Sequence, residues 1–237
     1  SVDSTLGINL RIKAHGENVA HYWIAAGTKY SEVVKLNKDI WEKTPEELIR
    51  RTENYWKLWV NKEMFNFHDL PQRFVSFFKR SLLIIRTQID NNGAIIAAND
   101  SDIVQLGRDT YSYMWPRDGA LVAYALIKSG YMDATKRFFQ FCADVISKDG
   151  YLLHKYNPDR SFASSWHPWL KDDKKSLPIQ EDGIALVIWA LWQHYDEFRD
   201  IEFVKPLYRS FIMNAAEFMV KFRDEETGLP LNSYGLW

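Results

Sequence analysis

Two segments of this chain are apolar on nearly every side of a helix. Residues 119–127 read Gly-Ala-Leu-Val-Ala-Tyr-Ala-Leu-Ile, and residues 184–192 read Ile-Ala-Leu-Val-Ile-Trp-Ala-Leu-Trp. A helix without a polar face has to be buried among other elements. The longest uncharged stretch, residues 183–195, is too short to cross a bilayer, so we expect burial inside a helical protein.

Amphipathic helices are predicted on both sides of these two segments. Apolar periodicity indicates helices at about 71–90, 118–128, 133–147, 182–198 and 203–223, and the first, third and fifth are apolar on one side only. The alternation of outer and inner helices predicts a toroid of helical hairpins, with an inner ring inside an outer ring. Trp189 and Trp192 are expected in its core. Pro206 is expected in the first turn of the fifth helix, where proline is tolerated.

The beginning of the chain has a different pattern. Apolar residues alternate with polar ones over residues 6–14, a turn sequence follows at 15–18, and residues 19–26 form a second apolar run. This pattern predicts a β-hairpin, which needs further strands to be stable in water. From Ser31 the period becomes helical, and Thr44-Pro45-Glu46-Glu47 is a strong helix start. The sequence therefore predicts the end of a β domain followed by a helical linker.

Composition excludes several classes of function. The net charge is −1, so no basic field favours nucleic acid or an anionic membrane as a partner. The single cysteine excludes an intrachain disulfide, and the histidines lack metal-ligand spacing, so we expect neither a metal nor a cofactor. The first residues are polar and contain no secretory core, which favours a cytoplasmic location.

Three predicted outer-to-inner connections carry the residues that suggest chemistry. They are residues 111–118, residues 165–169 together with 180–182, and residues 229–237. In a toroid these connections open on the same rim, so their side chains should converge in one cavity. Tryptophans mixed with carboxylates and an arginine are typical of sugar binding, because an indole packs on the apolar face of a pyranose while charged groups bond its hydroxyls.

Each of these residues also has a purely structural interpretation. Asp118 and Asp182 stand at helix starts, where a carboxylate is an ordinary cap. Arg117 can pair with a neighbouring acid, and Trp166 and His167 can be packing residues in a proline-flanked loop. The case for a binding site therefore depends on the three connections together.

The chain resembles a known family in these same segments. The matching text is Gly93–Ala98, Tyr-Ser-Tyr-Met-Trp-Pro-Arg-Asp at 111–118, Ser-Trp-His-Pro at 165–168, Gln-Glu-Asp-Gly at 180–183, and residues 228–237. It resembles the glucoamylase-type family of inverting glycoside hydrolases, which includes glucoamylases, glucodextranases and some trehalases. The resemblance implies a mainly α fold: the last strands of a β-sandwich in residues 1–30, a helical linker in 31–70, and the first half of an (α/α)6 catalytic toroid in 71–237.

The resemblance also implies a role for each candidate residue. Arg117 and Asp118 would hold the O4 and O6 hydroxyls of the non-reducing terminal glucose. The remaining candidates would pack beside that glucose, border the cleft, lie near the next sugar or flank the reaction centre: Trp115, Trp166, His167, Gln180, Glu181, Asp182, Leu236 and Trp237.

The family's general acid is expected just after Trp237 and its general base much later, so we expect no catalytic carboxylate and no turnover in this chain alone. The rest of the catalytic domain, or a partner subunit, would complete the barrel. The expected substrate is an α-linked glucose oligosaccharide or polysaccharide, with trehalose and α-1,6-glucans as alternatives. A non-catalytic regulatory module with the same toroid is a hypothesis from another class. A helical toroid that carries out isoprenoid chemistry is not supported, because the sequence shows none of the metal-binding or diphosphate-binding motifs that it would need.

Overall fold

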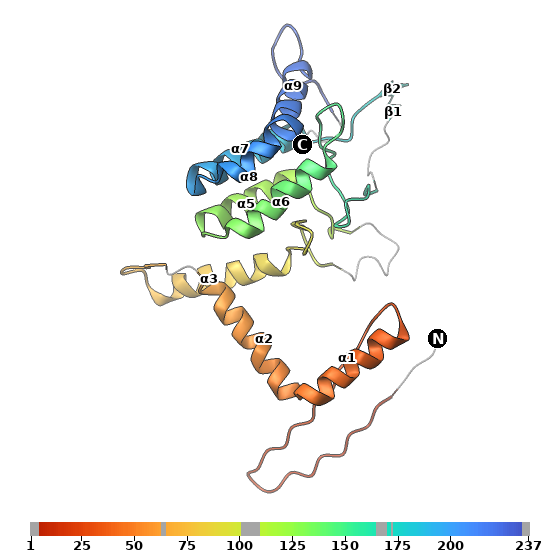
Figure 1. Cartoon of the computed structure of the whole chain (residues 1–237), viewed down its shortest axis with the longest axis vertical. Helices are drawn as coiled ribbons and strands as arrows, with labels where there is room; N and C mark the ends of the chain where they lie inside the picture. The colour runs from red at the N-terminus through yellow and green to blue at the C-terminus, as the bar shows by residue number, and fades with distance from the viewer. Residues whose placement is uncertain (1–4, 63–64, 101–109, 165–169, 172, 234–237) are drawn as a thin grey trace. The chain divides into compact units, whose positions relative to one another are not determined.

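The computed structural model of the chain describes residues 5–62, 65–100, 110–164, 170–171 and 173–233. The chain divides into two compact units, residues 1–62 and 63–237, which we describe separately (Figure 1). The predicted mainly α class is confirmed, because the strands among the described residues are a single two-residue pair, β1 (Leu170–Lys171) and β2 (Lys174–Lys175). None of the described helices combines the length and the apolar character needed to cross a membrane.

The first unit opens with two extended limbs joined by a turn. Gly16 N donates to Lys13 O at 2.9 Å, and His15 takes a left-handed φ of 58°. Among residues 5–29, however, no strand is formed, which corrects the predicted β-hairpin. An isolated hairpin is marginal in water, and no described segment pairs with these limbs. The apolar residues Leu6 and Ile12 remain exposed as a result.

Two helices follow in the first unit, α1 (Tyr30–Lys43) and α2 (Pro45–Val60). Thr44 separates them with a φ of 62°, and its hydroxyl accepts a hydrogen bond from Glu47 N at 3.4 Å. Pro45 takes the first helical position, where its missing N–H costs nothing. The predicted helix start is thus confirmed in its cap and its proline.

The second unit contains all five predicted helices. The elements are α3 (Gln72–Thr87), α5 (Pro116–Lys128), α6 (Met132–Val145), α7 (Glu181–Phe198), α8 (Ile201–Leu207), the π-helical segment η1 (Tyr208–Met213) and α9 (Asn214–Lys221). The last three run on without a break and correspond to the fifth predicted helix. The observed ends lie within a few residues of those predicted from the apolar periodicity.

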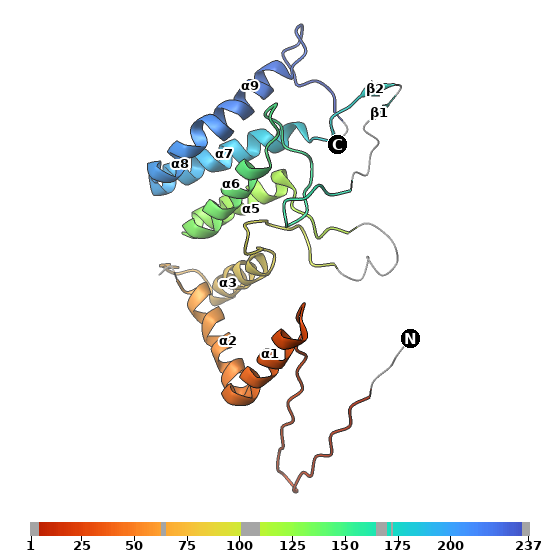
Figure 2. The same ribbon diagram turned by 45° about the vertical axis from the view of Figure 1, so that its right-hand side comes forward.

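The two most apolar helices pack against each other. Figures 1 and 2 show α5 and α7 side by side, with α6 packed against both. The helix α6 contributes three fully buried rings, Phe138, Phe139 and Phe141, to the core between them. This packing places the first turns of α5 and α7 next to each other, which is what positions the site described below.

One face of the α5–α7 pair remains open. Trp189 and Trp192 are 37% and 55% exposed, which corrects the prediction that both lie in the core, and Leu121 of α5 is 51% exposed. The Trp189 ring lies 4.7 Å from that of Tyr124, centroid to centroid, so it still packs on α5. Trp189 and Trp192 are exposed because no described element covers them fully, whereas Leu121 lines a cavity that α3 also borders.

Pro206 also lies elsewhere than predicted. The helix begins at Ile201, so Pro206 is its sixth residue and lies beyond the first turn. A proline there removes the hydrogen bond to the carbonyl four residues earlier and crowds that carbonyl. The wider π-helical segment η1 begins two residues later, at Tyr208, where the hydrogen-bond pattern changes register.

Two glycines in the first turns of α5 and α7 make a matched pair. A Cβ on Gly119 would overlap Cε2 of Phe138 and lie 2.9 Å from its Cζ, whereas a Cβ on Gly183 would meet nothing closer than 3.8 Å. We expect Gly119→Ala to destabilise the protein by about 1–2 kcal/mol, because overpacking outweighs the helix preference of alanine. Gly183→Ala should be neutral or stabilising. Urea unfolding of both variants checks this, and equal midpoints would contradict it.

Candidate functional site

The first turn of α5 carries the charged pair expected from the sequence. Trp115 precedes the helix in an extended conformation, and Pro116 takes the first helical position. Asp118 then lies one residue from Arg117 in the same turn, with Arg117 Nε 3.5 Å from Asp118 Oδ2. The Asp118 side chain is 49% exposed, so its carboxylate is accessible to a ligand as well as paired with the guanidinium.

Gln180 connects this pair to α7. Its side chain is 5% exposed, and its amide oxygen faces the Arg117 guanidinium, accepting hydrogen bonds from Nη1 at 3.0 Å and Nη2 at 3.3 Å. The two helix starts lie close together here, since a Cβ on Gly183 would lie 3.8 Å from Arg117 N, which is ordinary van der Waals contact. Arg117 therefore contacts both Asp118 and Gln180, which links the first connection to the second.

The third connection is tied to the second through Ser233. Ser233 N donates to Glu181 Oε1 at 2.8 Å, and Ser233 Oγ donates to Ile179 O at 2.8 Å. One carboxylate oxygen of Glu181 is thus engaged within the protein, while Asp182 is exposed at the start of α7. Four further predicted site residues lie outside the described residues: Trp166, His167, Leu236 and Trp237.

The acids in these helix starts are not N-caps. The N-cap positions of α5 and α7 are Trp115 and Gln180, and neither makes a side-chain capping bond. Asp118 and Asp182 lie inside the first turns, where a carboxylate is favoured by the helix dipole but is free to bond other groups. The capping interpretation of Asp118 therefore loses its main support.

Three aromatic residues, Tyr111, Tyr113 and Trp115, precede the Arg117–Asp118 pair in the chain, and their rings form what we call the aromatic wall. The Tyr111 and Trp115 rings are stacked at 5.8 Å with an interplanar angle of 28°, and the Tyr113 ring meets Trp115 edge-on at 5.7 Å. Tyr111 is 53% exposed and Trp115 is 6% exposed, so the accessible aromatic surface is mainly that of Tyr111, supported from behind by Trp115. An aromatic face and charged hydrogen-bonding groups complement the C–H face and the hydroxyls of a sugar.

Sequence reasoning missed a buried lysine behind this wall. Lys155 is 1% exposed, and its Nζ lies 4.1 Å from the Tyr113 ring centroid and 5.9 Å from that of Trp115. Its Nζ also donates to Ser164 Oγ at 3.4 Å. The sequence of residues 152–156, Leu-Leu-His-Lys-Tyr, places a lysine next to apolar residues, but it has no alternating pattern that would have predicted its burial.

Isolated β-bridges hold the wall in place. Met114 and Tyr156 exchange two backbone hydrogen bonds of 2.9 Å each, and further bridges link Ile96 to Met114 and Tyr156 to Phe162. Met114 and Tyr156 are almost completely buried. Trp115 and Lys155, the chain neighbours of this bridge, are therefore fixed relative to each other by backbone hydrogen bonds.

Asp118 also lines a cavity of about 350 Å³. Its remaining lining is mainly aliphatic and comes from α3, the following segment and α5: Ile84, Ile85, Gln88, Ile95, Ile96, Ala97, Gly119, Leu121 and Val122. Asp118 is the one carboxylate in this lining. Across the part of the chain that the structure describes, no group of three or more histidine, cysteine or acidic residues is arranged to hold a metal ion.

Comparison with known families decides the identity of the chain. The sequence pattern described as glycosyl hydrolases family 15 matches residues 75–222, which is more than half of the chain. The chain belongs to this family. The matched segment contains the Arg117–Asp118 pair, Gln180 and the aromatic wall.

Individual proteins are similar to parts of the chain. An uncharacterized glycosyl hydrolase of Methanocaldococcus jannaschii is 28% identical over 177 residues, which covers 73% of this chain and 26% of the relative. The family 15 chain therefore spans about a quarter of that relative's length. Among solved structures, a glycosidase variant and a glycosidase variant in complex with glucose each match with 22% identity and a TM-score of 0.49, covering 67% of this chain and 43% of theirs.

Proposed function

We propose that this family 15 chain is part of an exo-acting, inverting α-glucosidase of the glucoamylase type, which releases glucose from the non-reducing ends of α-glucans. The observation that carries the proposal is the Arg117 guanidinium held between Asp118 and Gln180, beside the stacked rings of Tyr111 and Trp115. A terminal sugar has hydroxyls for the first group and a C–H face for the second.

The chemistry of the pair suits the end of a sugar chain. A carboxylate accepts two hydroxyl protons, and a guanidinium donates in a fixed fork. Each hydrogen bond to a charged group contributes roughly 1.5–3 kcal/mol, so two such bonds are enough to select a chain end. Arg117 is itself oriented by Gln180, which reduces the loss of side-chain freedom on binding.

An inverting mechanism requires more than the groups that bind the terminal sugar. It needs a general acid and a general base about 6.5–9.5 Å apart, with a water between the base and the sugar. We propose that both carboxylates are supplied by the rest of the catalytic domain, and that this remainder also covers the open face formed by Leu121, Trp189 and Trp192. A partner subunit of the same helical build is the alternative source.

The first experiment follows the anomeric proton signals of maltotriose, isomaltose and trehalose with the full-length protein. Early β-glucose from one of them would establish an inverting α-glucosidase and identify the linkage. Hydrolysis of trehalose or of isomaltose in place of maltotriose would instead indicate a trehalase or a glucodextranase. If no substrate released glucose while sugars still shifted protein signals, the regulatory sugar-binding module would replace the proposal.

A second prediction concerns the 237-residue chain by itself. We expect it to release no glucose from any of these sugars, because the proposal places both catalytic carboxylates outside it. The control is the full-length protein at equal molar concentration. Glucose release by the purified chain, at a rate that follows its concentration, would contradict this assignment of the carboxylates.

A further inference from the structure

A tight turn over residues 157–161 lies next to the aromatic wall. Arg160 N donates to Asn157 O at 3.0 Å, and Asn157 N donates to Ser161 O at 3.0 Å. Arg160 closes this turn with a φ of 72°, which is in the left-handed region. Residues with a Cβ adopt that region at an energetic cost, whereas glycine does not. An arginine at this position therefore needs a compensating interaction.

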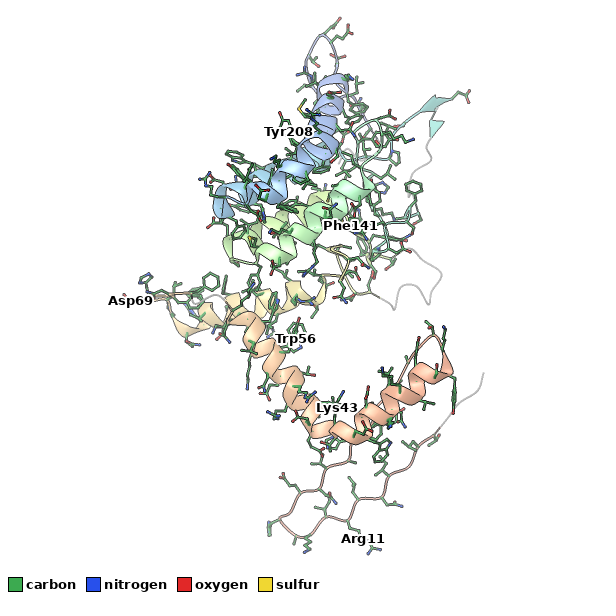
Figure 3. The ribbon with its side chains drawn as sticks, viewed as in Figure 1. Arg11, Lys43, Trp56, Asp69, Phe141 and Tyr208 are labelled. Atoms are coloured by element: carbon green, nitrogen blue, oxygen red, sulfur yellow. The ribbon has the colours of Figure 1, made fainter. Side chains whose placement is uncertain are left out.

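The Arg160 guanidinium makes that interaction with two other segments. Its Nε lies 3.1 Å from Asp144 Oδ2 in α6, and its Nη2 donates to Asn92 O at 3.2 Å, in the turn that follows α3. Its Cζ lies 5.2 Å from the ring centroid of Phe141, which is labelled in Figure 3. Gln140 Nε2 holds the other oxygen of Asp144 at 2.7 Å. The planar guanidinium of Arg160 thus joins the turn to α6 and to the segment after α3.

The same turn leads directly to the back of the wall. Ser164 Oγ lies 3.2 Å from the Tyr113 hydroxyl and 3.4 Å from Lys155 Nζ. Phe162, between the turn and Ser164, pairs with Tyr156 in a β-bridge. A shift of the turn would therefore be transmitted to the groups that contact Trp115.

We propose that Arg160 is a positioning residue for the sugar site: by holding the 157–161 turn against Asp144 and Asn92, it keeps Ser164 against Tyr113 and Lys155 and so orients Trp115. This inference rests on the proposed function, since it assigns Trp115 to the terminal sugar. Arg160 acts through Ser164 and Tyr113, and not through the Arg117–Asp118 pair.

The test compares Arg160→Gly with Arg160→Ala in the full-length protein, using the sugar that it hydrolyses. Both substitutions remove the guanidinium and its contacts with Asp144 and Asn92. Glycine also relieves the strain of the left-handed φ at residue 160, whereas alanine keeps that strain. We expect KM to rise about five- to twentyfold in both variants with kcat within about threefold, because the proposed function assigns the aromatic wall around Trp115 to binding the sugar in the ground state and the transition state alike. Thermal unfolding should separate the variants, with Arg160→Gly the more stable.

Two controls make the result specific. Arg209→Ala, at an exposed arginine of η1, should leave KM unchanged. Asp144→Asn should raise KM as Arg160→Gly does, and the double variant should show little further increase, because the two residues act as one unit. Wild-type KM in Arg160→Gly, or fully additive effects in the double variant, would overturn the inference.

A measurement that needs no turnover separates this inference from the proposed function. Hydrogen exchange of the full-length protein should become about tenfold faster in peptides covering residues 111–117 and 155–164 in both Arg160 variants. If the wild-type protein hydrolyses no sugar, the proposed function fails, and this faster exchange still supports positioning by Arg160. Unchanged exchange in both peptides would overturn the positioning role whatever the activity.

Discussion

Asp118→Asn in the full-length protein should lower kcat/KM by about a hundredfold or more. Asparagine keeps the shape of the side chain but loses the charge, and its NH2 group replaces an acceptor oxygen. Two hydrogen bonds from sugar hydroxyls to a carboxylate contribute roughly 3–6 kcal/mol together, and each 1.4 kcal/mol is a factor of about ten in rate. The substitution also weakens the interaction with Arg117, because Arg117 Nε lies 3.5 Å from Asp118 Oδ2 and would then face an uncharged group.

A matched control is available in Asp133, which occupies the first turn of α6 as Asp118 occupies that of α5. Asp133→Asn removes the same charge from the same kind of helix position, so it accounts for the helix-dipole contribution. We expect its kcat/KM to stay within about twofold of the wild type. A loss below about tenfold in Asp118→Asn would return Asp118 to a structural role.

The second large effect concerns a buried histidine where α6, α7 and α8 meet. His194 is completely buried, and its ring lies 5.6 Å from Phe139, 4.9 Å from Phe198 and 5.4 Å from Phe203, measured between centroids. Its Nδ1 lies 2.9 Å from Thr135 Oγ1. This environment is suited to a neutral imidazole and not to a charged one.

The hydrogen bonds favour one tautomer. When Thr135 Oγ1 donates its single proton to Met132 O at 2.8 Å, it accepts from His194, which places the proton on Nδ1. Nε2 is then a buried acceptor, and it has no hydrogen-bond partner among the described residues. Burial lowers the pKa of His194 from 6.5 to about 4; the nearby Asp200 carboxylate opposes this shift and Lys136 adds to it.

The stability of the protein should therefore fall with acidification. The folded-state pKa lies below the unfolded value, so the unfolded chain takes up a proton first as the pH falls from 6.5 toward 4. The contribution of His194 to the free energy of unfolding is complete above pH 6.5. It is lost progressively down to about pH 4, by about 3 kcal/mol in total. Urea unfolding at intervals between pH 4.5 and 7.5 measures the slope.

His194→Asn isolates this effect. Its amide nitrogen can still donate to Thr135, but it does not titrate, so the slope between pH 4.5 and 6.5 should be much shallower than in the wild type. The difference in the free energy of unfolding between the two proteins at pH 7.5 measures the cost of the smaller side chain, and it is subtracted from the differences at lower pH. Parallel curves for the two proteins would show that His194 does not control the acid response.

The helices of the second unit were predictable because their signals are local. An apolar run such as residues 119–127 has the helical period within itself, and Pro116 marks the first helical position of α5. The Arg117–Asp118 pair was equally accessible, since its members are neighbours in the chain. Pro206 shows the limit: the start of the helix moved by two residues, from 203 to 201, and that was enough to place the proline beyond the first turn.

Other features depend on contacts between distant residues. The hydrogen bonds between Gln180 and Arg117 form only because α5 and α7 pack together, and Lys155 lies behind Tyr113 only because Met114 pairs with Tyr156. The exposure of Trp189 and Trp192 follows from which elements cover α7, and a residue's own hydrophobicity does not contain that information.

The helical class, the places of the five helices in the second unit and the candidate pair Arg117–Asp118 follow from the sequence alone, because hydrophobic period and chain adjacency are local properties. The packed structure was needed to show that Gln180 orients Arg117, that Lys155 supports the aromatic wall and that Arg160 joins three segments. These contacts link residues far apart in the chain, and their geometry exists only after the helices have packed.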